Sequence, residues 1–414
     1  MSGFIPPEIW NGFLLAFKYV YIGLPIWLPA IFLMMLFNAF LYYKRLKYWQ
    51  KEGSVLLEIK LPKEISKSPA AMEAVLGALH QTGKEGTWVD RIWKGQTRPW
   101  FSLEIISEGG NIRFFIWTKL AHRNPVEAHI YSQYPGVEIY EVEDYSKPFY
   151  YDPEKFSAWI GGFALTTKDA YPIKTYIDYG LEKDPKEEFK VDPMTPLIEF
   201  LGSITAGQNI WIQILIRGHK KRRFYEVFGE KEDTWKDEAK NEIKEIIEKL
   251  KTEGSNFPRI MTEGERNKVA ALERSVAKFP FDCGIRAIYL TEKDKFNPAN
   301  IGGIIGVWKQ FSSPELNGFK PNGWHALFDY PWEEWFNAKE KLIPKFLDEY
   351  KLRRFFHSPL KHKKVWGKDV YNKQIILNTE ELATIFHFPG AIASTPTLEK
   401  IPSLKSKAPS NLPI

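Results

Sequence analysis

The 414-residue sequence predicts an α+β protein that is attached to a membrane by one helix near its N-terminus. Two observations predict this class. Residues 19–43 form an uncharged apolar run, and strand-like and helix-like segments alternate along the rest of the chain. Apolar residues make up 44% and charged residues 26% of the chain, a composition that excludes a disordered or collagen-like protein.

The apolar run is long enough to cross a membrane. It has 25 residues, YVYIGLPIWLPAIFLMMLFNAFLYY, and roughly 20 apolar residues span a bilayer core. Pro25 and Pro29 predict that the helix is kinked or ends in the first half of the run. The shorter apolar segment at residues 7–17 predicts a helix that lies in the membrane interface. A helix buried in a protein core is the alternative for the run.

The charges around the run predict its orientation. Only Glu8 and Lys18 precede it, whereas four basic residues follow it directly: Lys44, Arg45, Lys47 and Lys51. By the positive-inside rule, the N-terminus then lies outside and the rest of the chain lies in the cytoplasm. We therefore expect residues 1–51 to anchor the chain by a single pass in the inner (plasma) membrane.

Residues 53–145 predict a first α+β module. Gly109-Gly110 between two apolar runs is a hairpin signal, and Ser66 or Ser68 before Pro69 is typical of a helix start. The expected elements are a strand at 54–62, a helix from Pro69 to Gly83, strands at 100–107 and 112–118, a helix opening at Asn124 and a strand at 137–143. This β-α-β-β-α-β order is that of the split βαβ, or ferredoxin-like, plan.

Residues 156–311 predict a second α+β module, related to the first, with a helical insertion. We expect strands at 158–165, 172–179, 209–218 and 284–292, a short helix at 194–204 and another helix that begins at Asn297-Pro298. Residues 232–278 are expected to form a helical arm between the last two strands. The second helix of the arm opens at Thr262, which has capping-box spacing with Glu265. The first helix carries an apolar stripe of Trp235, Ala239, Ile243, Ile246 and Leu250.

The C-terminal part is expected to be less regular. Residues 312–373 form an irregular or helical basic region in which Pro344 kinks or breaks a helix. Residues 374–414 form a strand and a helix, capped by Asn378 or Thr379, followed by a Pro-rich tail. The tail is expected to be extended or disordered.

The chain lacks the sequence motifs of common catalytic and cofactor sites. Walker A, G-x-G-x-x-G, H-E-x-x-H and G-x-S-x-G patterns are absent, and Gly302-Gly303 predicts a helix-packing face instead. Glu380 and Glu381 are adjacent on a helix, so their side chains diverge and do not form an acid–base pair. Cys283, the single cysteine, favours a buried structural thiol in a reducing compartment. We therefore predict no catalytic residue, no metal site and no cofactor.

Two basic groups near aromatic residues are the candidates for contact with nucleic acid or phosphate. One follows the strand at 209–218, and the other lies within residues 351–373. A solvated loop or contact with anionic lipid is the alternative for each group. The candidate contact residues are Lys220, Lys221, Arg222, Arg223, Arg353, Arg354, Lys361, Lys363 and Lys364.

Residues 375–389, IILNTEELATIFHFP, resemble a segment of membrane-anchored proteins that are linked to type IV secretion and conjugation. Two later motifs of that family have counterparts here in Thr395-Pro396 and Asn411-Leu412-Pro413. In fused relatives this segment joins the N-terminal region to a coupling ATPase motor of the HerA/FtsK type. Because this chain has no Walker A and stops at Ile414, the resemblance implies a motorless N-terminal part whose ATPase is supplied in trans. The candidate docking residues are Leu377, Asn378, Thr379, Glu381, Leu382, Phe386, His387, Phe388 and Pro389.

Three function hypotheses remain. The first is a non-enzymatic, membrane-anchored scaffold or adaptor of a type IV secretion- or conjugation-like system, which docks a P-loop ATPase through residues 374–413. The alternative is a membrane-tethered nucleic-acid-binding module that acts alone and binds in a salt-dependent way. The third, an unrecognised hydrolase, has no clustered polar site in the sequence. The lipid bilayer is the expected partner in the first two, whereas direct DNA contact and a homo-oligomer matching a ring-shaped motor stay open.

Overall fold

The computed structural model describes two compact units. One unit holds residues 1–53 and 83–98, and the other holds residues 54–82 and 99–414. The loop at 83–98, expected inside the first α+β module, thus belongs with the N-terminal helix. The described residues are 7–62, 67–182, 192–220, 235–250, 260–322, 338–358, 364–365, 368–369, 373–390 and 400–401.

The first unit is built on one long helix. α1 (Pro7–Glu52) runs without a break through Pro25 and Pro29, so neither a separate helix at 7–17 nor a helix end at the prolines is found. An 18-residue window of this helix is apolar enough to cross a membrane, and none of it is buried in the fold. The chain therefore has an N-terminal helix that is long and apolar enough to span a membrane. α3 (Trp88–Ile92) lies in the same unit.

The first half of the second unit is a ferredoxin-like module, as predicted. Its elements are β1 (Val55–Pro62), α2 (Pro69–Leu79), β2 (Trp100–Glu108), β3 (Asn111–Thr118), α4 (Arg123–Gln133) and β4 (Glu138–Val142). The strands lie in the order β4-β1-β3-β2, and all neighbours are antiparallel. Local chemistry specifies this order: Ser68 caps α2, and Gly109 and Gly110 turn the β2–β3 hairpin at φ values of 58° and 91°.

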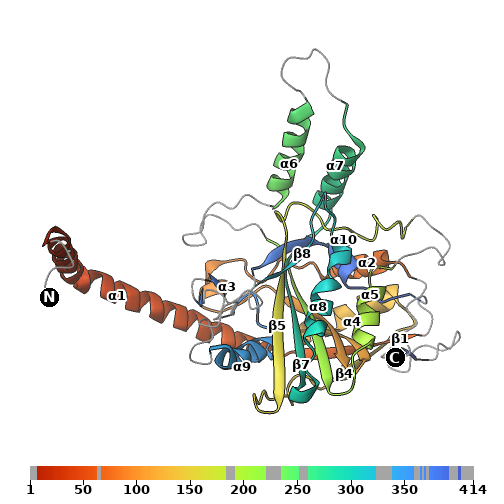
Figure 1. Ribbon diagram of the computed structural model, residues 1–414, viewed down its shortest axis with the longest axis horizontal. Helices are drawn as coiled ribbons and strands as arrows, with labels where there is room; N and C mark the ends of the chain where they lie inside the picture. Colours follow the sequence, from red (N-terminus) through yellow and green to blue (C-terminus); the bar gives the residue numbers. More distant parts are fainter. Residues whose placement is uncertain are drawn as a thin grey trace. The chain divides into compact units, whose positions relative to one another are not determined.

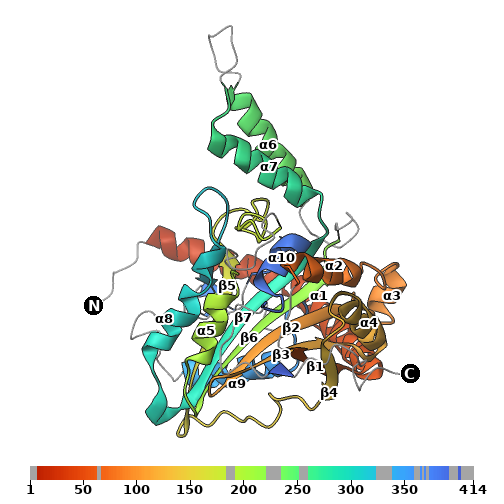
Figure 2. The ribbon, with the colours of Figure 1, turned by 90° about the vertical axis from the view of Figure 1, so that its right-hand side faces the viewer.

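The second half repeats the same plan. Its elements are β5 (Phe156–Leu165), α5 (Thr195–Gly202), β6 (Gln208–Gly218), β7 (Pro280–Glu292), α8 (Pro298–Gly306) and β8 (Phe319–Asn322). The strand order β8-β5-β7-β6 corresponds to that of the first half, again with antiparallel neighbours. The helical arm, α6 (Trp235–Leu250) and α7 (Glu263–Val276), is inserted into the β6–β7 hairpin. In the ribbon views the arm extends away from the sheet (Figures 1 and 2).

The two halves share one continuous sheet. β2 and β6, which hold the same position in their modules, pair antiparallel from Trp100 opposite Arg217 to Glu108 opposite Asn209. The halves are therefore related by an approximate two-fold axis between these strands. β11 (Ile375–Asn378) adds to the sheet beside β7, and β12 (Lys400–Ile401) pairs with β1 in parallel.

Helices cover both faces of this sheet. α5, α8 and α10 (Thr379–Ile385) lie on one side of β5 and β7, and α9 (Ala338–Lys351) lies on the other (Figure 1). Pro344 is accommodated inside α9 and does not break it. The remaining elements are the 3₁₀ helices η1 (Leu120–His122), η3 (Lys293–Lys295) and η4 (Lys309–Phe311), and the two-stranded β9 (Lys364–Val365) and β10 (Lys368–Asp369).

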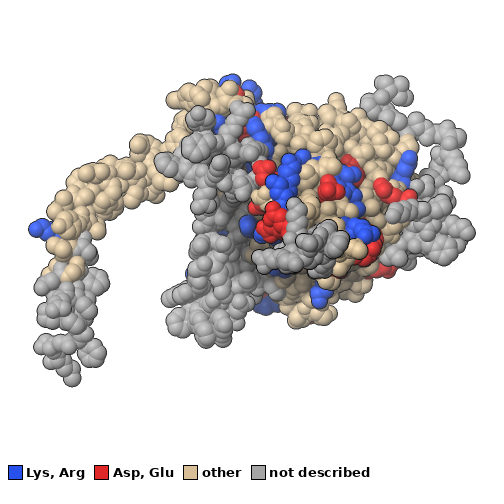
Figure 3. Space-filling model, turned by 90° about the horizontal axis from the view of Figure 1, so that it is seen from above, with Lys and Arg blue, Asp and Glu red and all other residues tan. Residues whose placement is uncertain are grey.

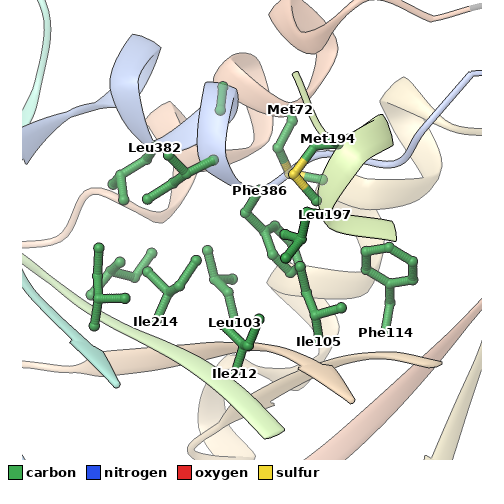
Figure 4. Packing of buried hydrophobic residues seen from close by; sticks show 14 of the residues in the cluster. Met72, Leu103, Ile105, Phe114, Met194, Leu197, Ile212, Ile214, Leu382 and Phe386 are labelled. Atoms are coloured by element: carbon green, nitrogen blue, oxygen red, sulfur yellow. The ribbon is translucent and has the colours of Figure 1, made fainter. Parts of the chain in front are cut away.

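The main hydrophobic core lies between the sheet and the helices on one of its faces, α10 among them. Leu103 and Ile212 of the sheet lie beneath Leu382 and Phe386 of the C-terminal segment (Figure 4). Gly303 confirms the predicted helix-packing role, because a Cβ there would come within 2.2 Å of the Phe200 ring. The absence of a side chain at this position lets α8 approach α5 closely.

Candidate functional site

The polar part of the interior lies on the sheet face opposite the main core. Glu104, Gln213 and Arg286 stand side by side on β2, β6 and β7, because the register pairs the first with the second and the second with the third. We call these three residues the polar row. Gln213 Nε2 donates to Glu104 at 2.7 Å, and Gln213 Oε1 accepts from Arg286 Nε at 2.7 Å. The row was not predicted, although its signal is present in the sequence as one central polar residue in each of three apolar strands.

Arg353, two residues after the end of α9, completes the polar row. Its Nε and Nη2 each donate to one carboxylate oxygen of Glu104 at 3.0 Å, and its Nη1 pairs with Asp144. The side chains of Arg353 and Glu104 are both 0% exposed. Burial lowers the pKa of Arg353, but the neighbouring side chains of Glu104, Tyr145 and Asp144 outweigh this effect and raise the pKa well above its ordinary value. Arg353 therefore stays charged beside the carboxylate of Glu104.

The Glu104 carboxylate has no acceptor capacity left for a substrate. Besides the two bonds from Arg353 and the one from Gln213, it accepts from Ser102 Oγ at 2.6 Å and from Tyr145 Oη at 2.8 Å. Arg353 was predicted as a nucleic-acid contact, and the structure corrects this, because the side chain is fully buried and held by carboxylates. We call the Arg353–Glu104 pair the clamp, because Arg353 holds in place the carboxylate that accepts from Gln213 across the junction of the two halves.

The C-terminal segment at 375–389 is part of the core. β11 pairs with β7, and every residue of α10 is buried. Phe388 packs edge-on against Phe114 and Tyr134, with ring centroids 5.8 and 4.9 Å apart. In this fold the segment holds the chain's own interior together and does not form a surface for a partner. All nine candidate docking residues are buried: Leu377, Asn378, Thr379, Glu381, Leu382, Phe386, His387, Phe388 and Pro389.

Residues 172–179 form backbone hydrogen bonds with side chains of α10 where a strand would pair with a neighbouring strand. Glu381 Oε1 accepts from the backbone N–H of Ile173 at 2.9 Å, and Thr384 Oγ1 accepts from that of Tyr176 at 3.0 Å. The prediction of a strand at 172–179 is therefore wrong: the apolar alternation is real, but α10 side chains satisfy these backbone groups.

Glu381 also confirms the predicted start of α10. Asn378 and Glu381 form a capping box, in which each side chain accepts from the other residue's backbone N–H at 2.9 Å. Burial raises the pKa of Glu381 to about 8, although its two backbone donors lower it.

Two further polar contacts fix this segment. His387 Nδ1 donates to the carbonyl of Ala383 at 2.8 Å, and its Nε2 lies 3.0 Å from Asp192. Burial opposes ionisation of Asp192, but His387 outweighs it, so the pKa of Asp192 is lowered. Glu380 accepts from Arg274 of α7 at 3.0 Å, which connects α10 to the base of the arm.

The first basic group begins beside a buried carboxylate. At the end of β6, Arg217 and His219 both contact the buried Asp282, at 2.8 and 2.6 Å. Arg217 also stacks on Phe356 at 4.3 Å, which places the end of β6 beside the segment that follows α9. Lys220 and Arg354 are both half-buried. Of the other candidates, Lys364 is described only as backbone of β9, and the following lie outside the described residues: Lys221, Arg222, Arg223, Lys361 and Lys363.

The helical arm packs against the body at its base and exposes two apolar side chains farther out. Ala239 and Leu272 are buried where α6 meets α7, and Glu242 of α6 accepts from Lys168 of the body at 2.6 Å. Ile247 and Ile260, farther along the arm, are 42% and 83% exposed. The face seen from above shows Lys and Arg intermixed with Asp and Glu and no patch of one sign among the residues drawn in colour (Figure 3).

The described part of the chain has a small pocket and a buried thiol, but no group of residues suited to hold a metal ion. None of its His, Cys, Asp or Glu residues form a group of three or more that could hold a metal ion. A shallow pocket beside Glu58, Lys60 and Arg113 has a volume of about 10 Å³, room for one water molecule. Cys283 is buried as predicted, and burial, with the nearby Asp282, raises the pKa of its thiol well above the ordinary value.

Fold and site together define a protein with an apolar N-terminal helix and two ferredoxin-like halves in one sheet, with a helical arm in the second half. The chain belongs to the family described as Domain of unknown function (DUF8128), which matches residues 44–400. The matched range starts directly after the apolar run and includes α10, in agreement with the place of α10 in the core. A search of curated proteins gives no match.

Proposed function

We propose that this chain is a membrane-anchored scaffold that docks a P-loop ATPase of the HerA/FtsK type supplied in trans. In this proposal it acts by binding, as part of a type IV secretion- or conjugation-like transfer system. The chain crosses the inner (plasma) membrane once, with its N-terminus outside and its body in the cytoplasm. The basic residues that follow the apolar run favour this orientation.

The exposure of α1 is the observation that carries the membrane attachment in this proposal. Ile26, Leu33 and Leu36 are 79%, 68% and 67% exposed, and the apolar window around them has no buried residue. A helix that is apolar on all sides and unpacked is stable in lipid and unstable in water. The resemblance at residues 375–389 supports the class of partner.

We assign the docking surface to the helical arm. Residues 375–389 are interior, so another exposed element has to contact the ATPase. The arm meets this need because it extends from the sheet, its base is held by ion pairs and its distal part exposes Ile247 and Ile260 (Figure 2).

A truncation of the distal arm tests this assignment. A short linker in place of residues 244–267 leaves the base contacts of Glu242, Lys268 and Arg274 intact, and helices in such hairpins connect over about 2–8 residues. Full-length and truncated proteins are purified from their native membrane, and bound proteins are identified by mass spectrometry. We expect the full-length protein to retain a P-loop ATPase and the truncation to lose about tenfold or more of it.

The control is Tyr150→Ala, which removes an 80% exposed ring outside the arm and should leave the recovered ATPase unchanged. Equal recovery with the truncated arm would refute the docking assignment. Recovery of nucleic acid in place of an ATPase would favour the stand-alone nucleic-acid-binding module.

A further inference from the structure

The loop at 83–98 packs closely against the end of α1. Gly95 has φ +66°, and a Cβ there would lie 2.5 Å from the carbonyl carbon of Lys44. Trp49 Nε1 donates to Thr97 Oγ1 at 2.9 Å. The ring of Trp93 meets Phe40 edge-on at 5.8 Å between centroids. The loop is therefore held at a defined level of the helix.

The short helix α3 within this loop turns its large apolar side chains outward. Thr87 and Asp90 form a capping box that starts the helix, and none of the residues of α3 is buried. Trp88 and Trp93 are 60% and 55% exposed, and Val89 is 38% exposed. Packing within the chain accounts for part of Trp93 through Phe40, but it leaves most of this apolar surface uncovered.

The level of the loop on α1 is that of a membrane interface. Phe40 belongs to the apolar run and lies four residues before Lys44, or about 6 Å along the helix at 1.5 Å per residue. Tryptophan is enriched at this depth, where hydrocarbon gives way to lipid headgroups. Lys47 is exposed near the same level, which favours anionic headgroups.

We infer that residues 87–93 form a second membrane contact, which inserts Trp88, Val89 and Trp93 into the headgroup–acyl boundary beside the end of α1. The occupant of this apolar surface is then an anionic lipid bilayer, in continuity with the spanning helix. This inference rests on the proposed function, because it requires α1 to cross the membrane. Its consequence is that α1 is fixed in rotation and depth by a wedge of side chains beside it.

Site-specific fluorescence in vesicles tests the inference. In a Cys283→Ala background, the full-length chain carries one new cysteine, Trp88→Cys or Val89→Cys, labelled with an environment-sensitive fluorophore. The vesicles contain phosphatidylcholine and phosphatidylglycerol, with or without a lipid whose quenching group lies near the headgroups. We expect a blue shift of emission and a loss of intensity with the quencher at both positions.

Two matched positions calibrate the signal. Phe37→Cys reports the apolar run itself and should lose intensity to the quenching lipid. Lys84→Cys should not, because Lys84 pairs with Glu52 at 2.7 Å, and Glu52 lies about 13 Å beyond the end of the run. Trp93 is not replaced, since its contact with Phe40 helps to hold the loop.

The outcomes separate this inference from the proposed anchor. Quenching at Phe37→Cys without quenching at Trp88→Cys and Val89→Cys would overturn the inference and leave the anchor standing. A blue shift at these two positions without lipid quenching would also overturn it, in favour of a protein surface. No quenching at Phe37→Cys would refute the anchor itself.

Discussion

Two apolar segments of this chain, α1 and the β11–α10 segment, lie in opposite environments. The apolar window of α1 has no buried residue, whereas every residue of α10 is buried. The difference lies in their polar residues. The run in α1 has no charge, while Glu381 and Thr384 of α10 bond the backbone of residues 172–179. Polar groups that find partners in the chain's own backbone tie an apolar segment to the core.

The largest expected effect contrasts one ring from each segment. Phe386→Ala removes a fully buried ring and should lower the free energy of unfolding of the body by about 3–5 kcal/mol. Phe37→Ala, in the exposed run of α1, should leave it nearly unchanged. Urea unfolding in detergent, followed by near-ultraviolet circular dichroism, measures both. Similar losses for the two variants would break the comparison.

The Arg353–Glu104 clamp should contribute a similar amount to the free energy of unfolding. Arg353→Ala leaves Glu104 buried without its charged partner, and we expect a loss of about 3–5 kcal/mol in the free energy of unfolding. Lys155→Ala, which removes a mostly exposed ion pair with Asp152, is the control and should have little effect. If Arg353→Ala unfolds at the same urea concentration as Lys155→Ala, the clamp does not stabilise the sheet.

The buried carboxylate of α10 should make stability depend on pH. Burial raises the pKa of Glu381 from 4.5 to about 8, so between these values the folded chain holds a proton that the unfolded chain has released. This contribution is therefore full below about pH 4.5 and decreases as the pH rises to about 8, by up to about 1.4 kcal/mol per pH unit. Urea midpoints measured across this range should fall less steeply for Glu381→Gln. Parallel slopes for the two proteins would show that Glu381 does not titrate in this way.

The smallest effect is local to the first unit. Gly95→Ala places a Cβ against the Lys44 backbone at a positive φ. We therefore expect it to lower the free energy that holds the loop at 83–98 in place by about 1–3 kcal/mol. Gly86→Ala, whose nearest contact would be 3.9 Å away, is the control. Hydrogen exchange of the loop should accelerate only in Gly95→Ala. Unchanged exchange would mean that the loop is not held by this close approach.

The first half of the fold could be predicted because its signals are local. The Gly109-Gly110 turn and the Ser68 cap act within a few residues, and they specify the β-α-β-β-α-β order. The second half has the same β-α-β-β-α-β order, with β6 and β7 as its central hairpin and the arm inserted between them. The arm between these strands hides their pairing from a sequence alone.

The parts that could not be predicted depend on distant partners. Glu104 and Arg353 are 249 positions apart, and Ile173 bonds a side chain 208 positions away. The docking role expected for residues 375–389 came from a family resemblance, whereas the contacts of these residues within the chain are with its own core. Nothing in the local pattern of residues 375–389 distinguishes the two.

Protease protection tests most directly whether α1 spans the membrane and the body lies in the cytoplasm. The full-length chain carries one epitope tag at each end, and sealed inside-out vesicles of the native membrane are treated with protease. Our account predicts that the N-terminal tag is protected until detergent is added, while the C-terminal tag is digested at once. Digestion of both tags in sealed vesicles, or protection of the C-terminal tag alone, would contradict it.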